Sequence, residues 1–197
     1  MVNPSVVNLP LTEEDAGRLE AGDFVLLNGL LVTGRDRIHK YLAEERPPRE
    51  EIPFDLRGAV LYHCGPVVKE SEGGFSVLSA GPTTSMRVEM YEADLIREYN
   101  LRGVMGKGGM GPKTLRALRE NGCVYLHTIG GAAVYLADRI EKVVGVWKLE
   151  EFGAAEAMWA LMVRDFPAIV TMDTHGNDLH KEVESRSLAR MGGSTPA

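Results

Sequence analysis

The first 80 residues show the hydrophobic pattern of short strands separated by turns. Apolar runs rich in β-branched and aromatic residues predict strands over residues 23–34, 59–67 and 74–82. Asn28-Gly29 inside the first run is typical of a hairpin turn, so one or two strands broken at this pair are expected there. Helices are expected near residues 13–20, where Thr12 and Asp15 resemble a capping box, and over 35–45, followed by a Pro-rich charged loop over 46–58.

From residue 85 onward, helical and strand patterns alternate. Helices are predicted over 85–100, 112–122 and 131–140, and strands over 103–106 and 123–130. Further strands are expected in "KVVGVWKLEEFG", "AMWALMVRDFP" and "AIVTMDTHG", with a short helix as an option near 154–158. This alternation predicts an α/β fold with a partly parallel sheet and strand–helix crossovers.

Length and composition narrow the class of protein. The 197 residues predict a single domain over 1–197, with an N-terminal arm or edge strand over 1–11 and a polar, mobile tail over 181–197. The net charge of −6 argues against nucleic acid as a partner. Apolar runs too short to span a bilayer and an N-terminus unlike a secretory signal indicate no membrane contact and a cytoplasmic location.

The cysteines and histidines offer little metal chemistry. Cys64 and Cys123 are too few for an iron–sulfur cluster and are expected to be small buried hydrophobic residues. His63 and His127 at strand ends are interpreted as core histidines. The segment "DTHGNDL" over 173–179 is interpreted as turn chemistry rather than a metal site. No metal ligand is therefore expected in this chain.

Three predicted strand-to-helix junctions carry glycine, hydroxyl and basic residues. They are residues 81–85, with Thr83, Thr84 and Ser85 followed by Arg87; residues 106–111, with Lys107; and residues 128–131. Ligands bind at the carboxyl edge of parallel strands, where helix N-termini attract anions and glycines allow close approach. The junctions together predict a site for a small anion, either phosphate or carboxylate.

A fourth candidate lies in "TGRDRIHKYL", where Arg35, Asp36 and His39 follow an apolar strand at a helix start. The pattern fits either an anion site, with Asp36 orienting Arg35, or an ordinary capped surface helix. The residue pattern alone leaves both interpretations open.

The motifs "TGRDRIHKYL", "YHCGPV", "SAGPTTSMRVEMY", "GKGGMG", "TIGGAA" and "DTHGNDL" resemble, in this order, the beta subunit or C-terminal domain of class I iron–sulfur fumarases and the related L-tartrate dehydratases. The resemblance covers roughly residues 10 to 180. It implies a swivelling β/β/α domain of a hydro-lyase. It also implies a partner alpha subunit in a heterotetramer, whose three cysteines carry a [4Fe–4S] cluster that acts as a Lewis acid on the substrate hydroxyl.

The resemblance also implies roles for individual residues. Arg35, Arg87 and Lys107 would contact the substrate carboxylates, with Thr84 beside them, and Thr83 would be the catalytic base. The remaining site positions would support these residues, namely Asp36, His39, Gly106, Gly108 and Gly109.

The implied reaction is the reversible hydration of fumarate to (S)-malate by the assembled complex. The alternatives are an L(+)-tartrate dehydratase beta subunit, whose product would be oxaloacetate, and a non-catalytic dicarboxylate-binding module. Met86 stands where the family often has glycine, which leaves the substrate open.

Overall fold

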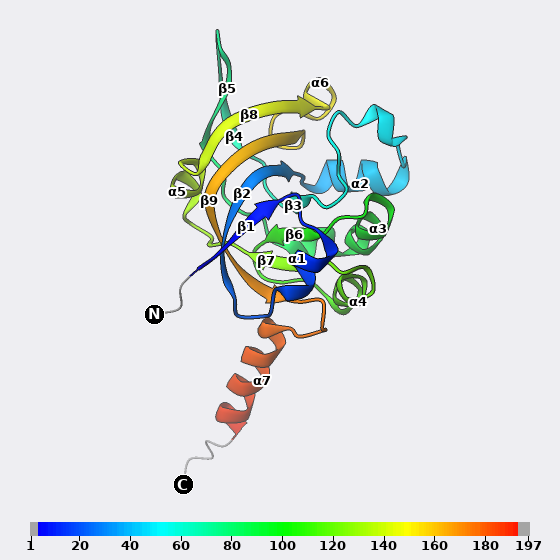
Figure 1. Cartoon of the computed structure of the whole chain (residues 1–197), viewed down its shortest axis with the longest axis vertical. Coiled ribbons are helices and arrows are strands. Elements are labelled where there is room, and N and C mark those ends of the chain that lie inside the picture. The colour runs from blue at the N-terminus through cyan, green and yellow to red at the C-terminus, as the bar shows by residue number, and fades with distance from the viewer. Residues whose placement is uncertain (1–3, 193–197) are drawn as a thin grey trace.

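A computed structural model describes residues 4–192 (Figure 1). The strands are β1 (Ser5–Leu9), β2 (Phe24–Thr33), β3 (Val60–Tyr62), β4 (Val67–Ser71), β5 (Gly74–Ser79), β6 (Gly103–Gly106), β7 (Val124–His127), β8 (Ile140–Trp147) and β9 (Met158–Met172). The α-helices are α1 (Glu13–Arg18), α2 (Asp36–Glu44), α3 (Glu89–Tyr99), α4 (Pro112–Asn121), α5 (Ala133–Ala137), α6 (Leu149–Phe152) and α7 (Leu179–Gly192). Short 3₁₀ turns form η1 (Arg49–Glu51) and η2 (Ser85–Val88).

The main sheet combines parallel and antiparallel strands. Its order is β1-β2-β3-β6-β7-β9-β8, and β9 also pairs with β2, so the pairings close a ring of β2, β3, β6, β7 and β9. Neighbours from β1 to β7 run parallel, whereas β9 is antiparallel to β2, β7 and β8. The β4–β5 hairpin is a separate two-stranded sheet that projects from the body (Figure 1). The expected α/β class with a partly parallel sheet is confirmed.

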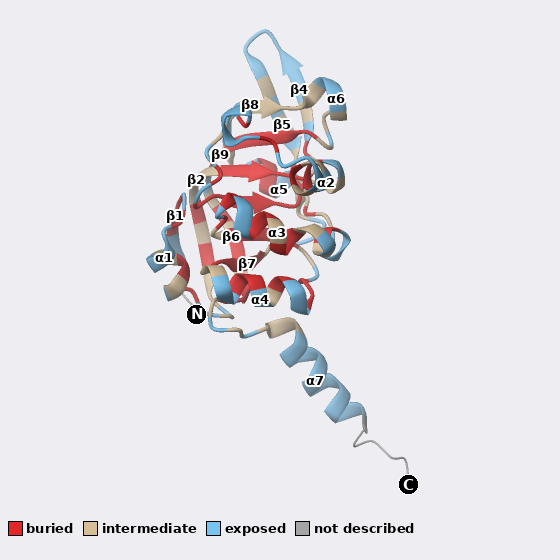
Figure 2. Cartoon of the chain, turned by 90° about the vertical axis from the view of Figure 1, so that its right-hand side faces the viewer, coloured by how far each residue is buried: buried red, intermediate tan, exposed pale blue. Residues whose placement is uncertain are grey.

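Successive side chains of the parallel strands feed two hydrophobic clusters. In β3, Val60 and Tyr62 belong to one cluster and Leu61 to the other, as the period of two in a strand requires. The second cluster also contains Leu42 and Ile96, so α2 and α3 cover that face of the sheet. Figure 2 shows the buried strands between exposed outer layers. Burial on both faces keeps the strand ends in fixed positions.

Three local expectations were wrong. Asn28-Gly29 forms no hairpin: β2 runs through it, with a register shift between Leu27 and Gly29 against β9. Gly29 pairs with Leu9 of β1 and has a φ of 120°, so neighbouring strands on both sides override the local turn preference. The short helix is α6, before residues 154–158, and the last two predicted strands form the single strand β9.

The two ends of the chain were only partly anticipated. Residues 5–9 form β1, the edge strand that was one of the two expectations for 1–11, while residues 1–3 lie outside the described residues. Much of the polar segment 181–197 belongs to α7, which extends away from the body and is exposed (Figure 2). Residues 193–197 lie outside the described residues. Within 4–192, no helix has the length and hydropathy needed to cross a bilayer.

Candidate functional site

The candidate site forms at the carboxyl ends of four adjacent parallel strands, β2, β3, β6 and β7. Thr33 at the end of β2 is in register with Tyr62 of β3, and Gly106 at the end of β6 is in register with His127 of β7. Arg35 therefore follows β2 at the same edge at which Lys107 follows β6. This edge brings together candidate residues separated by up to 72 positions in the sequence.

The loop of residues 81–85, which carries Thr83 and Thr84, reaches this edge by a route that the sequence did not predict. Its preceding strand, β5, belongs to the separate hairpin and not to the parallel sheet. The loop is instead held between the ends of β3 and β6. The backbone N–H of Thr83 donates to the carbonyl of His63 at 2.7 Å, and the N–H of Lys107 donates to the carbonyl of Thr83 at 3.3 Å. The N–H of Ser85 donates to the carbonyl of Lys107 at 3.0 Å, so Thr83 and Lys107 are fixed side by side.

Lys107 presents a cation without a counterion. Within residues 4–192, no carboxylate or hydrogen-bond acceptor pairs with its ammonium group, and the side chain is only half-buried. Its Nζ lies 3.7 Å from the place that a Cβ on Gly130 would occupy. The loop of residues 128–131 therefore leaves room for the lysine side chain. An ammonium group held in this way is suited to a carboxylate of a ligand.

Glycines after the lysine are needed for geometry. Gly108 and Gly109 have φ values of 85° and 76°, which side chains other than glycine rarely adopt. A Cβ on Gly109 would also lie 2.6 Å from Cδ2 of His180. A Cβ on Gly106 would clash with Oγ of Ser85. The loop is therefore packed against its neighbours through backbone atoms.

Arg87 is oriented by Asp36. Its Nε and Nη2 donate to the two carboxylate oxygens of Asp36 at 3.1 and 2.8 Å, and the side chain remains 54% exposed. This bidentate pair joins η2 to the first turn of α2 and leaves Nη1 without an acceptor among residues 4–192. The sequence had offered Asp36 as an orienter of Arg35, but Nη2 of Arg35 is 3.9 Å away from that carboxylate.

The partner of Arg35 is a residue that sequence reasoning missed. Nε of Arg35 lies 3.5 Å from Oε1 of Glu156, in the turn before β9. The other oxygen of Glu156 accepts a hydrogen bond of 2.8 Å from the backbone N–H of Arg37 and so caps α2, whose N-cap residue provides no side-chain cap. Glu156 is 121 residues beyond Arg35, and no local pattern marks it.

The N-terminus of α4, which follows the loop of residues 106–111, does not offer a free anion site. Glu89 of α3 accepts hydrogen bonds from the backbone N–H groups of Gly111 and Thr114 at 2.8 and 3.2 Å and from the Thr114 hydroxyl at 2.6 Å. The N-terminus of α4 therefore already holds a carboxylate of the protein itself. The expectation that this helix end binds the ligand was wrong, and the cation of the loop is Lys107.

Glu89→Ala is expected to lower the free energy of unfolding by about 2 kcal/mol, because three donors at the start of α4 lose a charged acceptor. Denaturant unfolding of the variant measures this loss. The matched control is Glu98→Ala on the exposed side of the same helix, which should change stability by less than about 0.5 kcal/mol. Equal stability of the two variants would contradict the capping role.

The hydroxyls of Thr83 and Thr84 have no hydrogen-bond partner among residues 4–192. Thr83 is half-buried and Thr84 is exposed at the same edge as Lys107. Both hydroxyls are therefore available to a ligand. The described part of this chain places no carboxylate or imidazole within hydrogen-bond distance of the Thr83 hydroxyl, so it offers no group to deprotonate it.

A buried polar cluster lies directly behind the loops. His39, His63 and Glu92 are 0%, 1% and 0% exposed in their side chains, and Oε2 of Glu92 lies 3.2 Å from Nε2 of His39 and 3.0 Å from Nε2 of His63. Burial opposes ionisation, but the two imidazoles outweigh it and lower the pKa of Glu92 to about 2. Burial lowers the pKa of His63, against the opposing effect of Glu92. The sequence did not identify Glu92, although it stands in the apolar register of its helix with Val88, Ile96 and Tyr99.

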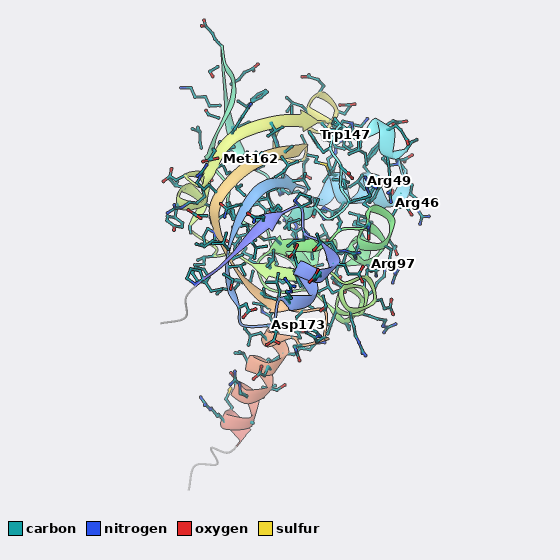
Figure 3. All side chains as sticks on the ribbon, in the orientation of Figure 1. Arg46, Arg49, Arg97, Trp147, Met162 and Asp173 are labelled. Carbon is teal, nitrogen blue, oxygen red and sulfur yellow. The ribbon has the colours of Figure 1, made fainter. Side chains whose placement is uncertain are left out.

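The other sequence-marked residues take structural positions. Cys64 and Cys123 are buried, as expected, and burial raises the pKa of Cys64 to about 12 and that of Cys123 well above its usual value. Asp173, labelled in Figure 3, accepts hydrogen bonds from the backbone of Ala21, His175 and Asn177, which confirms the turn.

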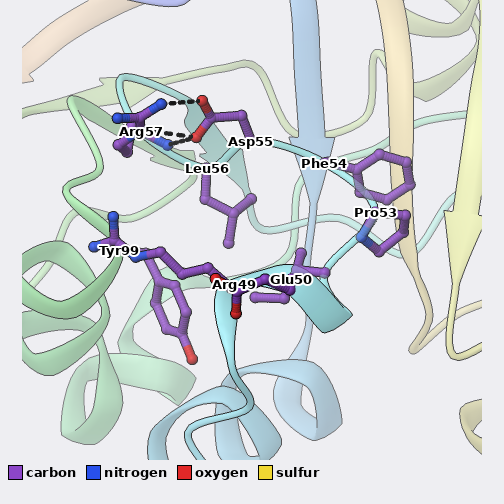
Figure 4. Close-up of a pocket in the computed structure, with 9 residues that line it drawn as sticks. Arg49, Glu50, Pro53, Phe54, Asp55, Leu56, Arg57 and Tyr99 are labelled. Atoms are coloured by element: carbon purple, nitrogen blue, oxygen red, sulfur yellow. Dashed lines mark hydrogen bonds and ion pairs between the residues drawn. The ribbon is translucent and has the colours of Figure 1, made fainter.

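A pocket of about 450 Å³ lies elsewhere (Figure 4). It is lined by the Pro-rich segment 49–57 together with Tyr99, and none of the candidate site residues borders it. Asp55 and Arg57 at its rim already pair with each other at 3.0 Å. This pocket is therefore separate from the candidate site residues.

Comparisons with known proteins identify the family of the chain. A putative fumarate hydratase class I of Geobacillus stearothermophilus is 54% identical over 183 residues, which are 92% of this chain and 34% of that relative. A putative L(+)-tartrate dehydratase subunit beta of Methanocaldococcus jannaschii is 40% identical over 182 residues, which are 92% of this chain and 93% of the relative. The L(+)-tartrate dehydratase subunit beta of Escherichia coli K12 is 40% identical over 184 residues, which are 90% of this chain and 87% of that relative.

The chain thus spans about a third of the length of the first relative and most of the length of the other two. The Fumarase C-terminus family matches residues 3–183, a range that contains all four strand ends and every candidate site residue. The resemblance drawn from the motifs is confirmed, and the chain belongs to the Fumarase C-terminus family.

Proposed function

We propose that this chain is the dicarboxylate-binding half of an iron–sulfur hydro-lyase and that it hydrates fumarate reversibly to (S)-malate together with a cluster-bearing alpha subunit in the cytoplasm. The observation that supports it most is Lys107, whose ammonium group has no counterion among residues 4–192 and whose backbone pairs with that of Thr83, at the sheet edge where Arg35 follows β2. Within the described chain, Arg87 keeps Nη1 free beside its pair with Asp36, so Lys107 and Arg87 could each contact one carboxylate of a diacid. The name of the 54% identical relative supports fumarate.

In this proposal, Arg87 and Lys107 hold the substrate carboxylates. Removal of the proton next to a carboxylate places negative charge on that group, and fixed cations stabilise such charge. Thr83 would take the proton from the substrate. Since no described residue of this chain places a carboxylate or imidazole within hydrogen-bond distance of its hydroxyl, the group that accepts the hydroxyl proton would come from the alpha subunit. The cluster would be held by that subunit, because the two cysteines of this chain, Cys64 and Cys123, are fewer than a cluster requires.

A second candidate is the L(+)-tartrate dehydratase reaction. The two relatives that carry this name match at 40% identity. The exposed hydroxyl of Thr84, next to Thr83, is available to hydrogen-bond the additional hydroxyl of tartrate. A non-catalytic dicarboxylate-binding module would use the same cations without turnover.

Anaerobic co-expression of the chain with an alpha subunit, followed by assays on fumarate, malate and L-tartrate, tests these candidates. The complex is expected to be brown and to turn over fumarate faster than tartrate, and the chain alone to be colourless and inactive. Faster turnover of tartrate would establish the second candidate. Dicarboxylate binding without turnover by a cluster-replete complex would favour the binding module. Cluster absorbance and turnover in the reconstituted chain alone would contradict the assignment of the cluster to the alpha subunit.

A further inference from the structure

Glu92 is a buried carboxylate for which the proposed chemistry has no use. It lies inside α3, is fully buried, and neither of its oxygens accepts a well-aligned hydrogen bond within residues 4–192. In the described part of the chain, only the imidazoles of His39 and His63 lie close enough to compensate its charge. Burying such an ion group costs free energy that a well-packed apolar residue would avoid. A purely structural helix position would be better filled by leucine or methionine.

Each histidine connects Glu92 to a different part of the site. Nδ1 of His39 lies 2.7 Å from the carbonyl oxygen of Arg35, and a carbonyl only accepts, so Nδ1 carries a proton and donates it. Nε2 of the same ring faces the Glu92 carboxylate at 3.2 Å. The imidazole of His39 therefore links the backbone of Arg35 to the carboxylate of Glu92.

His63 continues the connection to the threonine and lysine loops. Its Nε2 is 3.0 Å from Glu92 and its Nδ1 is 2.8 Å from Oγ of Ser85, which is in turn 2.9 Å from the hydroxyl of Tyr125. Burial raises the pKa of Tyr125, so this hydroxyl stays protonated and can donate to Ser85. Ser85 then donates to His63, and His63 directs its Nε2 proton at Glu92. The backbone of His63 and Ser85 binds Thr83 and Lys107 directly.

We propose that Glu92, acting through His39 and His63, positions the backbone of the three loops that carry Arg35, Thr83 and Lys107. The role rests on the proposed hydro-lyase function, and Glu92 is a positioning residue that does not contact substrate. Its carboxylate is the one group on which the links from all three loops converge. Loss of its charge leaves two imidazoles facing each other, with ring centroids 5.0 Å apart, without a counterion.

The same three side chains have ligand atoms within 4.8 Å of one another, as a metal site would. The two Nε2–Oε2 separations of 3.2 and 3.0 Å are instead those of charge-assisted contacts. A tetrahedral ion bound at about 2.0–2.1 Å would hold its ligand atoms about 3.3–3.4 Å apart. The two separations in the protein are slightly shorter than this spacing, and metal content is part of the test.

The test compares Glu92→Gln and Glu92→Asp with the control Glu98→Gln, an exposed glutamate of the same helix. Each variant of the full chain is assembled anaerobically with the alpha subunit, and kcat and KM for fumarate and malate are measured. We expect Glu92→Gln to lower kcat/KM about 100-fold, since small misplacements of catalytic groups have effects of this size. Glu92→Asp should retain more activity than Glu92→Gln, because it keeps the charge. A packing role predicts the reverse order, because glutamine keeps the shape.

Amide hydrogen exchange of the same variants supplies a readout that does not depend on turnover. The N–H groups of Thr83, Ser85 and Lys107 should exchange at least about 10-fold faster in Glu92→Gln and unchanged in Glu98→Gln. Should Glu92→Gln not fold, Ser85→Ala keeps both ion pairs, cuts the link from His63, and should accelerate the same amides. Normal exchange and turnover in Glu92→Gln, or a stoichiometric metal ion lost with Glu92, would overturn the proposal. A wild-type complex that turns over none of the dicarboxylates, together with accelerated exchange in Glu92→Gln, would refute the hydro-lyase function and leave the positioning role intact.

Discussion

Lys107→Met and Thr83→Val, assembled with a cluster-replete alpha subunit, are each expected to lower kcat about 100- to 1000-fold. Methionine keeps a long chain against Gly130 and removes only the ammonium, and valine keeps the shape of threonine and removes only the hydroxyl. Thr83→Val should change KM little, because a base acts in the transition state. Lys107→Met should also raise KM, because in the proposed function its cation binds the substrate carboxylate before reaction.

The double variant should lose much less than the product of the two single losses. Thr83 and Lys107 are joined by backbone pairing, and the cation also favours the ionised hydroxyl, so their effects are coupled. Lys113→Met on α4, where the amine pairs with Asp94 at 3.7 Å on the surface, serves as the matched control and should stay near wild type. Normal solvent exchange of the substrate C3 proton in Thr83→Val would exclude Thr83 as the base.

Arg87→Ala is expected to lower kcat/KM by about 30- to 800-fold, which corresponds to about 2–4 kcal/mol for a charged contact left unpaired. Arg87→Lys should lose less, because it keeps the charge, but it cannot reproduce the two hydrogen bonds to Asp36. The fold should survive both changes, since the side chain is half-exposed.

Arg97→Ala provides the control for this loss. Arg97, like Arg87, is a surface arginine that pairs with an aspartate, Asp94, at 3.1 Å. It belongs to α3 and lies on the outer side of the helices, away from the strand ends (Figure 3). Its removal should leave kcat/KM within about twofold. Steady-state kinetics on the assembled complex measures kcat/KM of both variants. Near-normal turnover in Arg87→Ala would show that Arg87 does not belong to the site.

Most helices and the parallel strands could be predicted because local patterns and tertiary packing agree there. Pro112 and Gly122 bound α4 as helix start and stop residues, and Thr12 caps α1 with Asp15. The Asn28-Gly29 signal failed because β1 and β9 pair with β2 on both sides of it. Cross-strand hydrogen bonds along a ten-residue strand outweigh the preference of one dipeptide.

The sequence by itself determined which residues carry charge and hydroxyl chemistry, since Arg35, Thr83, Arg87 and Lys107 stand in short motifs that do not depend on distant contacts. Only the tertiary structure decided what each of them faces. Asp36 pairs with Arg87, Glu156 lies beside Arg35, and Glu89 occupies the helix end that had seemed free. Glu92, too, was identified only from the tertiary structure. Counterions are chosen by proximity in space, and the closed sheet brings together residues whose separation in the chain no local pattern records.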